Sequence, residues 1–213
     1  MRYAAVVFDM DGVLVDSEPM HLDAMRELLR PYGVPYTDRE NEEFFGFTDP
    51  EVFRALRARY GLEPDEYDLT RRRAALLVEL TRKRTVPMPG VPDVPNALHR
   101  RGYRLAVASS SALDVIRATV DVLGIAALFE AVVSGLEVGR GKPAPDVFLE
   151  TARRLDLPPR ACLVIEDSRN GLLAAKAAGM GCVAIPCPAT RHEDFSGADF
   201  RLATLSELLP ILR

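Results

Sequence analysis

One segment decides the fold of this chain and locates its chemistry: Ala4-Ala5-Val6-Val7-Phe8-Asp9-Met10-Asp11-Gly12-Val13. Its first five residues are apolar without polar alternation, which is typical of a strand buried on both faces of a parallel sheet. Asp9 and Asp11 follow, and side chains two positions apart in extended chain project to the same side. We therefore expect both carboxylates to converge at the carboxyl end of this strand, where Gly12 lets the chain turn away.

The two carboxylates repel each other, so their arrangement requires a divalent cation or a proton held by one of them. Both conditions suit a pair in which one aspartate is a nucleophile and the other a general acid and base. By itself the pair also fits a solvated turn or a simple cation site. The choice between these interpretations depends on the rest of the chain.

Other apolar runs of the same kind alternate with segments of helical spacing. The runs cover residues 105–108, 162–165 and 182–185, with a weaker one at 131–133, and the helical segments cover 94–101, 112–123, 147–155 and 172–178. An edge strand at 198–202 and a helix at 205–212 are expected near the end. This alternation predicts an α/β fold with a doubly wound, Rossmann-like parallel sheet, in which ligands bind beyond the carboxyl ends of the strands.

The stretch from residue 18 to residue 87 interrupts the alternation, because it contains no good strand candidate. Its helical segments cover 20–29, 38–45, 50–60 and 69–83. We interpret residues 17–87 as an inserted all-α domain. Residues 1–16 and 88–213 then form the catalytic core.

Composition excludes several classes of protein. The chain has 213 residues, 27 Lys and Arg, 31 Asp and Glu, and a net charge of −4, which argues against a protein that coats nucleic acid or an anionic membrane. No apolar run approaches the roughly 18 residues of a membrane span, and charged residues follow the first strand so closely that we expect no signal peptide. Three cysteines, at positions 162, 182 and 187, are best interpreted as reduced thiols. We expect a cytoplasmic protein whose oligomeric state the sequence does not set; a monomer is compatible with it.

Polar residues follow the other predicted strands as well. Ser109, Ser110 and Ser111 place hydroxyl and backbone N–H groups where a helix begins, which is a natural cradle for an anion. Glu166 and Asp167 add two carboxylates after another strand. Lys142 lies in a loop ahead of a helix. Each feature alone also fits a helix cap, a solvated charge or a helix-start charge pattern. Together they gather carboxylates, hydroxyls and a cation at one sheet edge.

The whole set resembles the haloacid dehalogenase (HAD) superfamily, in the branch of β-phosphoglucomutase-like phosphatases with a helical cap. The matching motifs are Asp9-Met10-Asp11-Gly12-Val13 with Asp16-Ser17, Ser109-Ser110-Ser111, Lys142-Pro143-Ala144-Pro145-Asp146, and Glu166-Asp167-Ser168 with Gly171. They occur in the family's order and span the chain outside the insertion, which matches the family's cap. As a set these motifs are highly specific.

The resemblance implies a Mg²⁺-dependent phosphatase that acts on a small phosphorylated metabolite, such as a sugar phosphate. Asp9 would attack phosphorus in line and become an aspartyl-phosphate. Asp11 would protonate the leaving oxygen and then deprotonate the acceptor. Mg²⁺ would be held by the Asp9 carboxylate, the Asp11 backbone carbonyl and Asp167, with Glu166 close by.

The resemblance also implies a set of phosphate-binding residues. Ser109, the Ser110 backbone and Lys142 would hold the transferring oxygens, with Ser111 beside them. His21 matches a cap histidine that couples substrate binding to acid/base action, although a lone histidine is otherwise more often a surface or structural residue. Among Arg71, Arg72 and Arg73, we take Arg72 as the candidate substrate contact, while a solvated helix face accounts for most of the cluster.

Three alternatives remain. In a β-phosphoglucomutase an arginine three residues after the cap glycine grips a second phosphate, whereas here Gly46 is followed at that position by Asp49, which would repel it. A non-enzymatic binding module on the same fold is a further alternative, but a degenerate copy should have lost a motif residue, and none is lost. Asp11 disfavours a haloacid dehalogenase proper.

Overall fold

The computed structural model describes residues 3–44 and 47–212, which form two compact units. One unit comprises Met1–Asp16 and Thr85–Arg213, and the other comprises Ser17–Arg84. The second unit ends three residues before the boundary expected from the sequence. The reason is that residues 85–88 pair with the first unit: the Asp16 amide donates to the Val86 carbonyl over 2.9 Å, and the Met88 amide donates to the Leu14 carbonyl over 3.1 Å.

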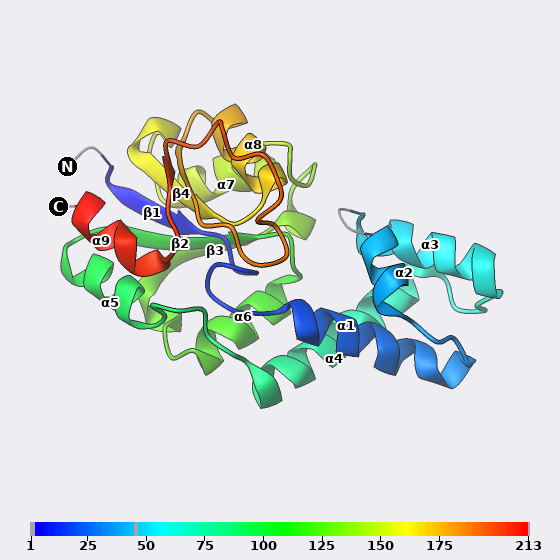
Figure 1. The fold of residues 1–213 in the computed structure, drawn as a ribbon. Helices are drawn as coiled ribbons and strands as arrows, with labels where there is room; N and C mark the ends of the chain where they lie inside the picture. The colour runs from blue at the N-terminus through cyan, green and yellow to red at the C-terminus, as the bar shows by residue number, and fades with distance from the viewer. Residues whose placement is uncertain (1–2, 45–46, 213) are drawn as a thin grey trace. The chain divides into compact units, whose positions relative to one another are not determined.

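A six-stranded parallel sheet forms the centre of the first unit (Figure 1). The strands are β1 (Ala5–Phe8), β2 (Arg104–Ser109), β3 (Phe129–Ser134), β4 (Cys162–Glu166), β5 (Gly181–Ala184) and β6 (Phe200–Arg201). Their spatial order is β3-β2-β1-β4-β5-β6, and every pair is parallel. The order reverses at β1, between β2 and β4, so the carboxyl end of β1 is the topological switch point at which such sheets bind ligands. The predicted fold class is confirmed.

Helices cover both faces of this sheet. They are α5 (Asp93–Arg100), α6 (Leu113–Val122), α7 (Asp146–Arg154), α8 (Arg169–Ala177) and the short α9 (Leu208–Ile211). Figure 1 shows α7 and α8 on one face and α5 and α6 on the other. The single helix expected at 205–212 is instead a 3-10 turn, Leu205–Glu207, followed by α9. Pro210, which lacks an amide hydrogen, lies within this short segment.

The core between the sheet and helices α7 and α8 explains which way the first motif points. Ala5 and Val7 of β1 belong to one buried cluster with Cys162 and Val164 of β4 and with Phe148 of α7. Because side chains alternate along a strand, the next residues in these series, Asp9 and Glu166, are directed to the same face. The register sets β1 and β4 side by side, with Phe8 opposite Ile165. Two carboxylates are thereby delivered next to each other at one sheet edge.

The second unit is entirely helical. Its elements are α1 (Glu18–Leu29), a 3-10 turn (Arg30–Tyr32), α2 (Asp38–Glu43), α3 (Asp49–Tyr60) and α4 (Glu66–Arg84). Phe53, Leu56 and Leu69 are fully buried in its own apolar cluster. A capping box between Thr48 and Glu51 begins α3. The last residue of the helix expected at 38–45 lies outside the described residues, as does Gly46.

None of the helices in the described ranges, 3–44 and 47–212, is both long and apolar enough to cross a membrane.

Candidate active site

Lys142 joins two of the carboxylates at the carboxyl edge of the sheet. Its Nζ donates to Oδ1 of Asp9 over 2.6 Å, to Oε1 of Glu166 over 2.6 Å and to the Ala108 carbonyl over 3.2 Å. These contacts use all three donors of the ammonium group. Lys142 comes from the loop before α7, the helix that packs on the face to which Asp9 and Glu166 are directed.

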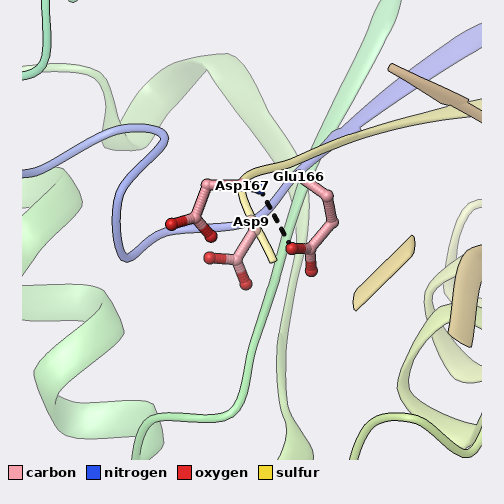
Figure 2. Close-up of side chains that lie close together, drawn as sticks. All are labelled: Asp9, Glu166 and Asp167. Carbon is pink, nitrogen blue, oxygen red and sulfur yellow. Dashed lines mark hydrogen bonds between the residues drawn. The ribbon is translucent and has the colours of Figure 1, made fainter. Parts of the chain in front are cut away.

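Asp9, Glu166 and Asp167 form a buried cluster of three carboxylates (Figure 2). Each offers a ligand oxygen within 4.8 Å of those of the other two, and their exposed fractions are 6%, 1% and 7%. Three carboxylates and the Lys142 ammonium sum to −3 + 1 = −2 when all are ionised. A buried charge of this size requires compensation, and a hard divalent cation with oxygen ligands supplies it. The donor set therefore fits Mg²⁺.

The pKa values show the same imbalance. Burial raises the pKa of Asp9 well above its ordinary value, against the lowering effect of Lys142, and Glu166 raises it further. Burial, aided by Glu166, raises the pKa of Asp167 to about 7. Burial alone would lower the pKa of Lys142, but Asp9 and Glu166 outweigh it, so this pKa lies above its ordinary value. The lysine stays charged, while the raised pKa values of Asp9 and Asp167 oppose ionisation of these two carboxyl groups without a further cation.

Both oxygens of Glu166 already accept hydrogen bonds from the chain. Oε1 accepts from Lys142, and Oε2 accepts from the amide of Asp167 over 3.2 Å and from the amide and hydroxyl of Ser168 over 3.2 and 2.9 Å. Ser168 also caps α8 by accepting from the Gly171 amide. A side chain at Gly171 would overlap the Glu166 carboxyl group, which explains the glycine. The sequence predicted Glu166 beside a metal ion. In the structure both of its carboxylate oxygens accept hydrogen bonds, from Lys142 and from the start of α8.

Gly12 makes room for Asp167. Its φ of +75° lies in the left-handed region, as a turn away from β1 requires. A Cβ at this position would also overlap the Asp167 carboxylate. The turn was predicted from the sequence, whereas the close approach of β4's end to the backbone of residue 12 was not.

Asp11 faces the serines rather than the three-carboxylate cluster. Its Oδ2 accepts from the Ser111 hydroxyl over 3.0 Å and from the Ser109 hydroxyl over 3.4 Å. The Ser111 amide in turn donates to the Ser109 hydroxyl over 3.0 Å. Asp9 and Asp11 thus lie at the same edge, as expected, but with different partners. Asp11 can exchange a proton through hydroxyl contacts while Asp9 lies against the lysine.

The loop after β2 is held by a residue that sequence reasoning missed. The buried Ser134, at the end of β3, donates to the Ser111 carbonyl over 2.6 Å and accepts from the Leu136 amide over 3.1 Å. Its signal in the sequence was its place directly after the weak apolar run at 131–133. Ser110 is exposed at the same loop, next to the backbone of Gly135.

In the helical unit Arg73 contacts His21, whereas Arg72, the candidate substrate contact, lies away from it. Arg73 donates to both Asp49 carboxylate oxygens over 2.8 Å, and its Nη2 lies 3.0 Å from Nδ1 of His21. Arg72 contacts Tyr32 and Asp68, and its side chain is 53% exposed against 13% for Arg73.

Helical periodicity explains the difference between the two arginines. Arg73 lies four residues after the buried Leu69 and four before the buried Leu77, and therefore on the buried stripe of α4. Arg72 is rotated about 100° from Arg73 around the helix axis, and its side chain contacts Tyr32 and Asp68. This signal was present in the sequence.

Fold and site together define a class of hydrolase. The switch-point aspartate, the lysine that bridges it to an acidic pair, and the serine loop belong to one known arrangement, and the family model described as haloacid dehalogenase-like hydrolase matches residues 3–179. The chain belongs to this family.

Named relatives lie within the same family. The protein CbbY of Rhodobacter capsulatus is 36% identical over 97% of this chain and 95% of its own length. The fructose-1-phosphate phosphatase YqaB of Escherichia coli K12 is 35% identical over 85% of this chain and 96% of its own. Crystal structures of CbbY from Rhodobacter sphaeroides, in complex with phosphate and with xylulose 1,5-bisphosphate, superpose with a TM-score of 0.88 at 32% identity, covering 97% of this chain and 96% of theirs.

Proposed function

We propose that this chain is a Mg²⁺-dependent phosphatase that hydrolyses a small phosphorylated metabolite through an aspartyl-phosphate on Asp9. One observation carries the proposal: the buried Asp9, at the switch point of the sheet, contacts the Lys142 ammonium group beside two other buried carboxylates. Phosphoryl transfer requires mainly positioning and charge neutralisation, and each residue of this site serves one of the two.

Asp9 is the nucleophile in this proposal. Its carboxylate attacks phosphorus, the bond from phosphorus to the leaving oxygen breaks, and an acyl phosphate forms on Asp9. Water then attacks the same phosphorus and returns Asp9 as a carboxylate. The raised pKa of Asp9 makes charge compensation a condition for attack, because only the ionised form is nucleophilic.

Asp11 moves the proton in both steps. It protonates the leaving oxygen in the first step and accepts a proton from water in the second. The hydroxyls of Ser109 and Ser111 hold Asp11 in place. When phosphate is bound, these hydroxyls and the Ser110 backbone are the donors for the transferring oxygens.

Lys142 keeps a positive charge beside the reacting group. Its raised pKa ensures that it stays an ammonium ion in the physiological range. Glu166 holds the lysine from the other side at 2.6 Å, and the amides at the start of α8 hold Glu166. Charge stabilisation in such a fixed arrangement needs no reorganisation during the reaction.

Mg²⁺ would be held by the carboxylates of Asp9 and Asp167 and by the backbone carbonyl of Asp11. It would neutralise the phosphoryl oxygens and lower the proton affinity of Asp9. Glu166 stands beside this set, with its oxygens already engaged by Lys142 and α8.

The substrate we propose is a sugar phosphate or a similar monoester. The relatives support this class, since one is named a fructose-1-phosphate phosphatase and another was solved with xylulose 1,5-bisphosphate. In the helical unit, Asp49 already engages Arg73 through both of its oxygens, which leaves a carboxylate where the resemblance would place a cation for a second phosphate. This counts against the phosphomutase alternative. Three free cysteines support a cytoplasmic location.

The test is release of inorganic phosphate, with Mg²⁺ and with chelator, from a panel of sugar phosphates, phosphoglycolate and nucleotides. We expect release that depends on Mg²⁺ and is lost in Asp9→Asn. β-Glucose 1-phosphate is also assayed for conversion to glucose 6-phosphate. Isomerised sugar phosphate without released phosphate would replace the phosphatase by the mutase, and no Mg²⁺-dependent turnover on any substrate would support the non-enzymatic module.

A further inference from the structure

Ser134 ends β3 with a fully buried side chain, and the proposed reaction steps do not use it. The register of β2 and β3 sets Ser134 opposite Ser109, the last residue of β2. Because the two strands are parallel, both end at the carboxyl edge of the sheet. Ser134 therefore lies beside the loop that carries Ser110 and Ser111.

The hydroxyl of Ser134 has a defined direction. It accepts from the Leu136 amide over 3.1 Å and donates to the Ser111 carbonyl over 2.6 Å. A hydroxyl has one proton to donate, and this one is committed to the carbonyl. The two bonds join the 3-10 turn Gly135–Glu137, which Ser134 caps, to the serine loop after the neighbouring strand.

The residue after Ser134 packs closely on the same loop. A Cβ at Gly135 would lie 3.2 Å from the Cα of Ser110 and 3.4 Å from the carbonyl oxygen of Ser109. The glycine thus lets the backbone at the end of β3 approach the backbone at the end of β2. The hydrogen bond of Ser134 is made beside this close contact, and the two together restrain the loop.

Ser111 carries this restraint to the residue that moves the proton. Besides the carbonyl held by Ser134, its amide donates to the Ser109 hydroxyl over 3.0 Å, and its own hydroxyl donates to Oδ2 of Asp11 over 3.0 Å. The Ser109 hydroxyl contacts the same oxygen of Asp11 over 3.4 Å. A shift of residue 111 would therefore disturb both contacts of the Asp11 carboxylate. The chain of hydrogen bonds spans the ends of β3, β2 and β1, which are neighbours in the sheet.

We propose that Ser134 is a positioning residue for Asp11: through Ser111 it holds the Asp11 carboxylate where it can protonate the leaving oxygen. A general acid works only within hydrogen-bond reach of the atom that it protonates, and a misplacement of about 1 Å can lower a rate about 100-fold. Ser134 itself touches no reacting atom. This inference rests on the proposed function, in which Asp11 is the general acid.

The test compares kcat/KM for the best sugar phosphate with kcat/KM for p-nitrophenyl phosphate, whose leaving group needs no proton. This constant covers the steps up to the acyl phosphate on Asp9, so hydrolysis of that intermediate does not enter. We expect Ser134→Ala to lower kcat/KM about 10- to 100-fold for the sugar phosphate and less than about threefold for p-nitrophenyl phosphate. If Ser134 only capped the turn after β3, both substrates would lose equally.

Three further variants separate positioning from a loss of stability. Ser134→Thr keeps the hydroxyl and should stay within about threefold of the wild type on both substrates. Thr151→Ala is the matched control, because the buried Thr151 hydroxyl donates to the Val147 carbonyl over 2.7 Å inside α7. It should lower the Tm and leave the ratio of the two kcat/KM values unchanged. In the Asp11→Asn chain, adding Ser134→Ala should cause no further loss on the sugar phosphate, since the group that Ser134 positions is gone.

Each outcome is decisive. Equal losses on the two substrates in Ser134→Ala, with unequal losses in Asp11→Asn, would overturn the role of Ser134 and leave the proposed function intact. A full further loss when Ser134→Ala is added to Asp11→Asn would also overturn it. A wild-type chain that hydrolyses neither substrate would overturn the proposed function and this inference with it. If Ser134→Ala is unfolded at the assay temperature, Ser134→Cys carries the comparison, since it keeps the size of the side chain and replaces the hydroxyl by a weak donor.

Discussion

Replacing Lys142 by methionine removes, at nearly constant side-chain volume, the ammonium group that contacts two carboxylates of the three-carboxylate cluster. The ammonium makes two contacts of 2.6 Å, to Asp9 and Glu166, and one of 3.2 Å, to the Ala108 carbonyl. Its loss leaves two carboxylates, 6% and 1% exposed, without their cation. Removing one partner of a buried ion pair costs about 3–5 kcal/mol, because the other charge stays buried. We expect a loss of this size at about pH 8.

The loss depends on pH in a defined direction. Without the ammonium, the pKa of Asp9 in the folded state rises further above that of the unfolded chain, so the folded state holds a proton that the unfolded state releases. Stability of the variant then falls as pH rises through this window, by about 1.4 kcal/mol per pH unit for each such proton. The deficit against the wild type should therefore shrink toward about pH 5.

The assay is urea unfolding in chelator at about pH 5 and pH 8, for the wild type, Lys142→Met and the control Lys176→Met. Lys176 pairs with Asp199 over 2.9 Å in a more exposed setting, where such a pair contributes about 0.2–1 kcal/mol. The reasoning is refuted if Lys142→Met loses no more stability than the control at pH 8. It is refuted equally if its deficit is the same at both pH values.

Three further predictions concern the packing and the protons of the site. Gly171→Ala forces the Glu166 carboxyl group away from Lys142, so we expect the free energy of unfolding to fall by about 1–3 kcal/mol and kcat to fall as well. The control Gly141→Ala, at an open position, should change neither quantity in unfolding and turnover assays. Because the pKa of Asp167 is raised to about 7, the metal-free fold loses stability as pH rises from about 4 to 7, and Mg²⁺ binds the ionised form. Mg²⁺ should therefore raise the Tm much more at pH 8 than at pH 5.5. The same Mg²⁺-induced rise in Tm in Asp167→Asn would contradict this. Asp11→Asn should lower kcat by about 10²- to 10⁴-fold for an alkyl phosphate and by less for p-nitrophenyl phosphate, whose leaving group needs no proton. Stopped-flow turnover with both substrates measures the two losses in kcat. Equal losses would contradict the role of Asp11 as proton donor.

Local pattern predicted most of the sheet because its strands are buried on both faces. Ala5–Phe8 and Cys162–Glu166 contain uninterrupted apolar runs, and such runs leave little choice of structure. The weaker run predicted at 131–133 belongs to a longer strand, Phe129–Ser134. The apolar pattern missed the start of this strand because Glu130 is exposed and Phe129 is only half-buried. Apolar runs in the sequence report burial, so a strand predicted from them is too short wherever one of its residues faces solvent.

The candidate residues could be predicted once the strands were predicted, because a parallel sheet gathers the carboxyl ends of its strands at one edge. Which of them touch was not predictable. The contact of Lys142 with Asp9 joins residues 133 positions apart through an irregular loop. The separation of Asp11 from the other carboxylates depends on how the chain turns at Gly12. The largely buried position of Arg73 could have been predicted from the period of α4, which sets Arg73 in line with Leu69 and Leu77.

The most direct test of the central claim is to look for the phosphoryl group on residue 9. The enzyme is mixed with its best substrate and Mg²⁺, quenched in acid within one turnover and analysed by mass spectrometry after digestion. We expect a phosphoryl adduct on the peptide that contains Asp9. Hydroxylamine should remove it, as it removes an acyl phosphate, and Asp9→Asn should not form it. Normal turnover by Asp9→Asn, or an adduct on a different residue of a turning-over enzyme, would contradict it.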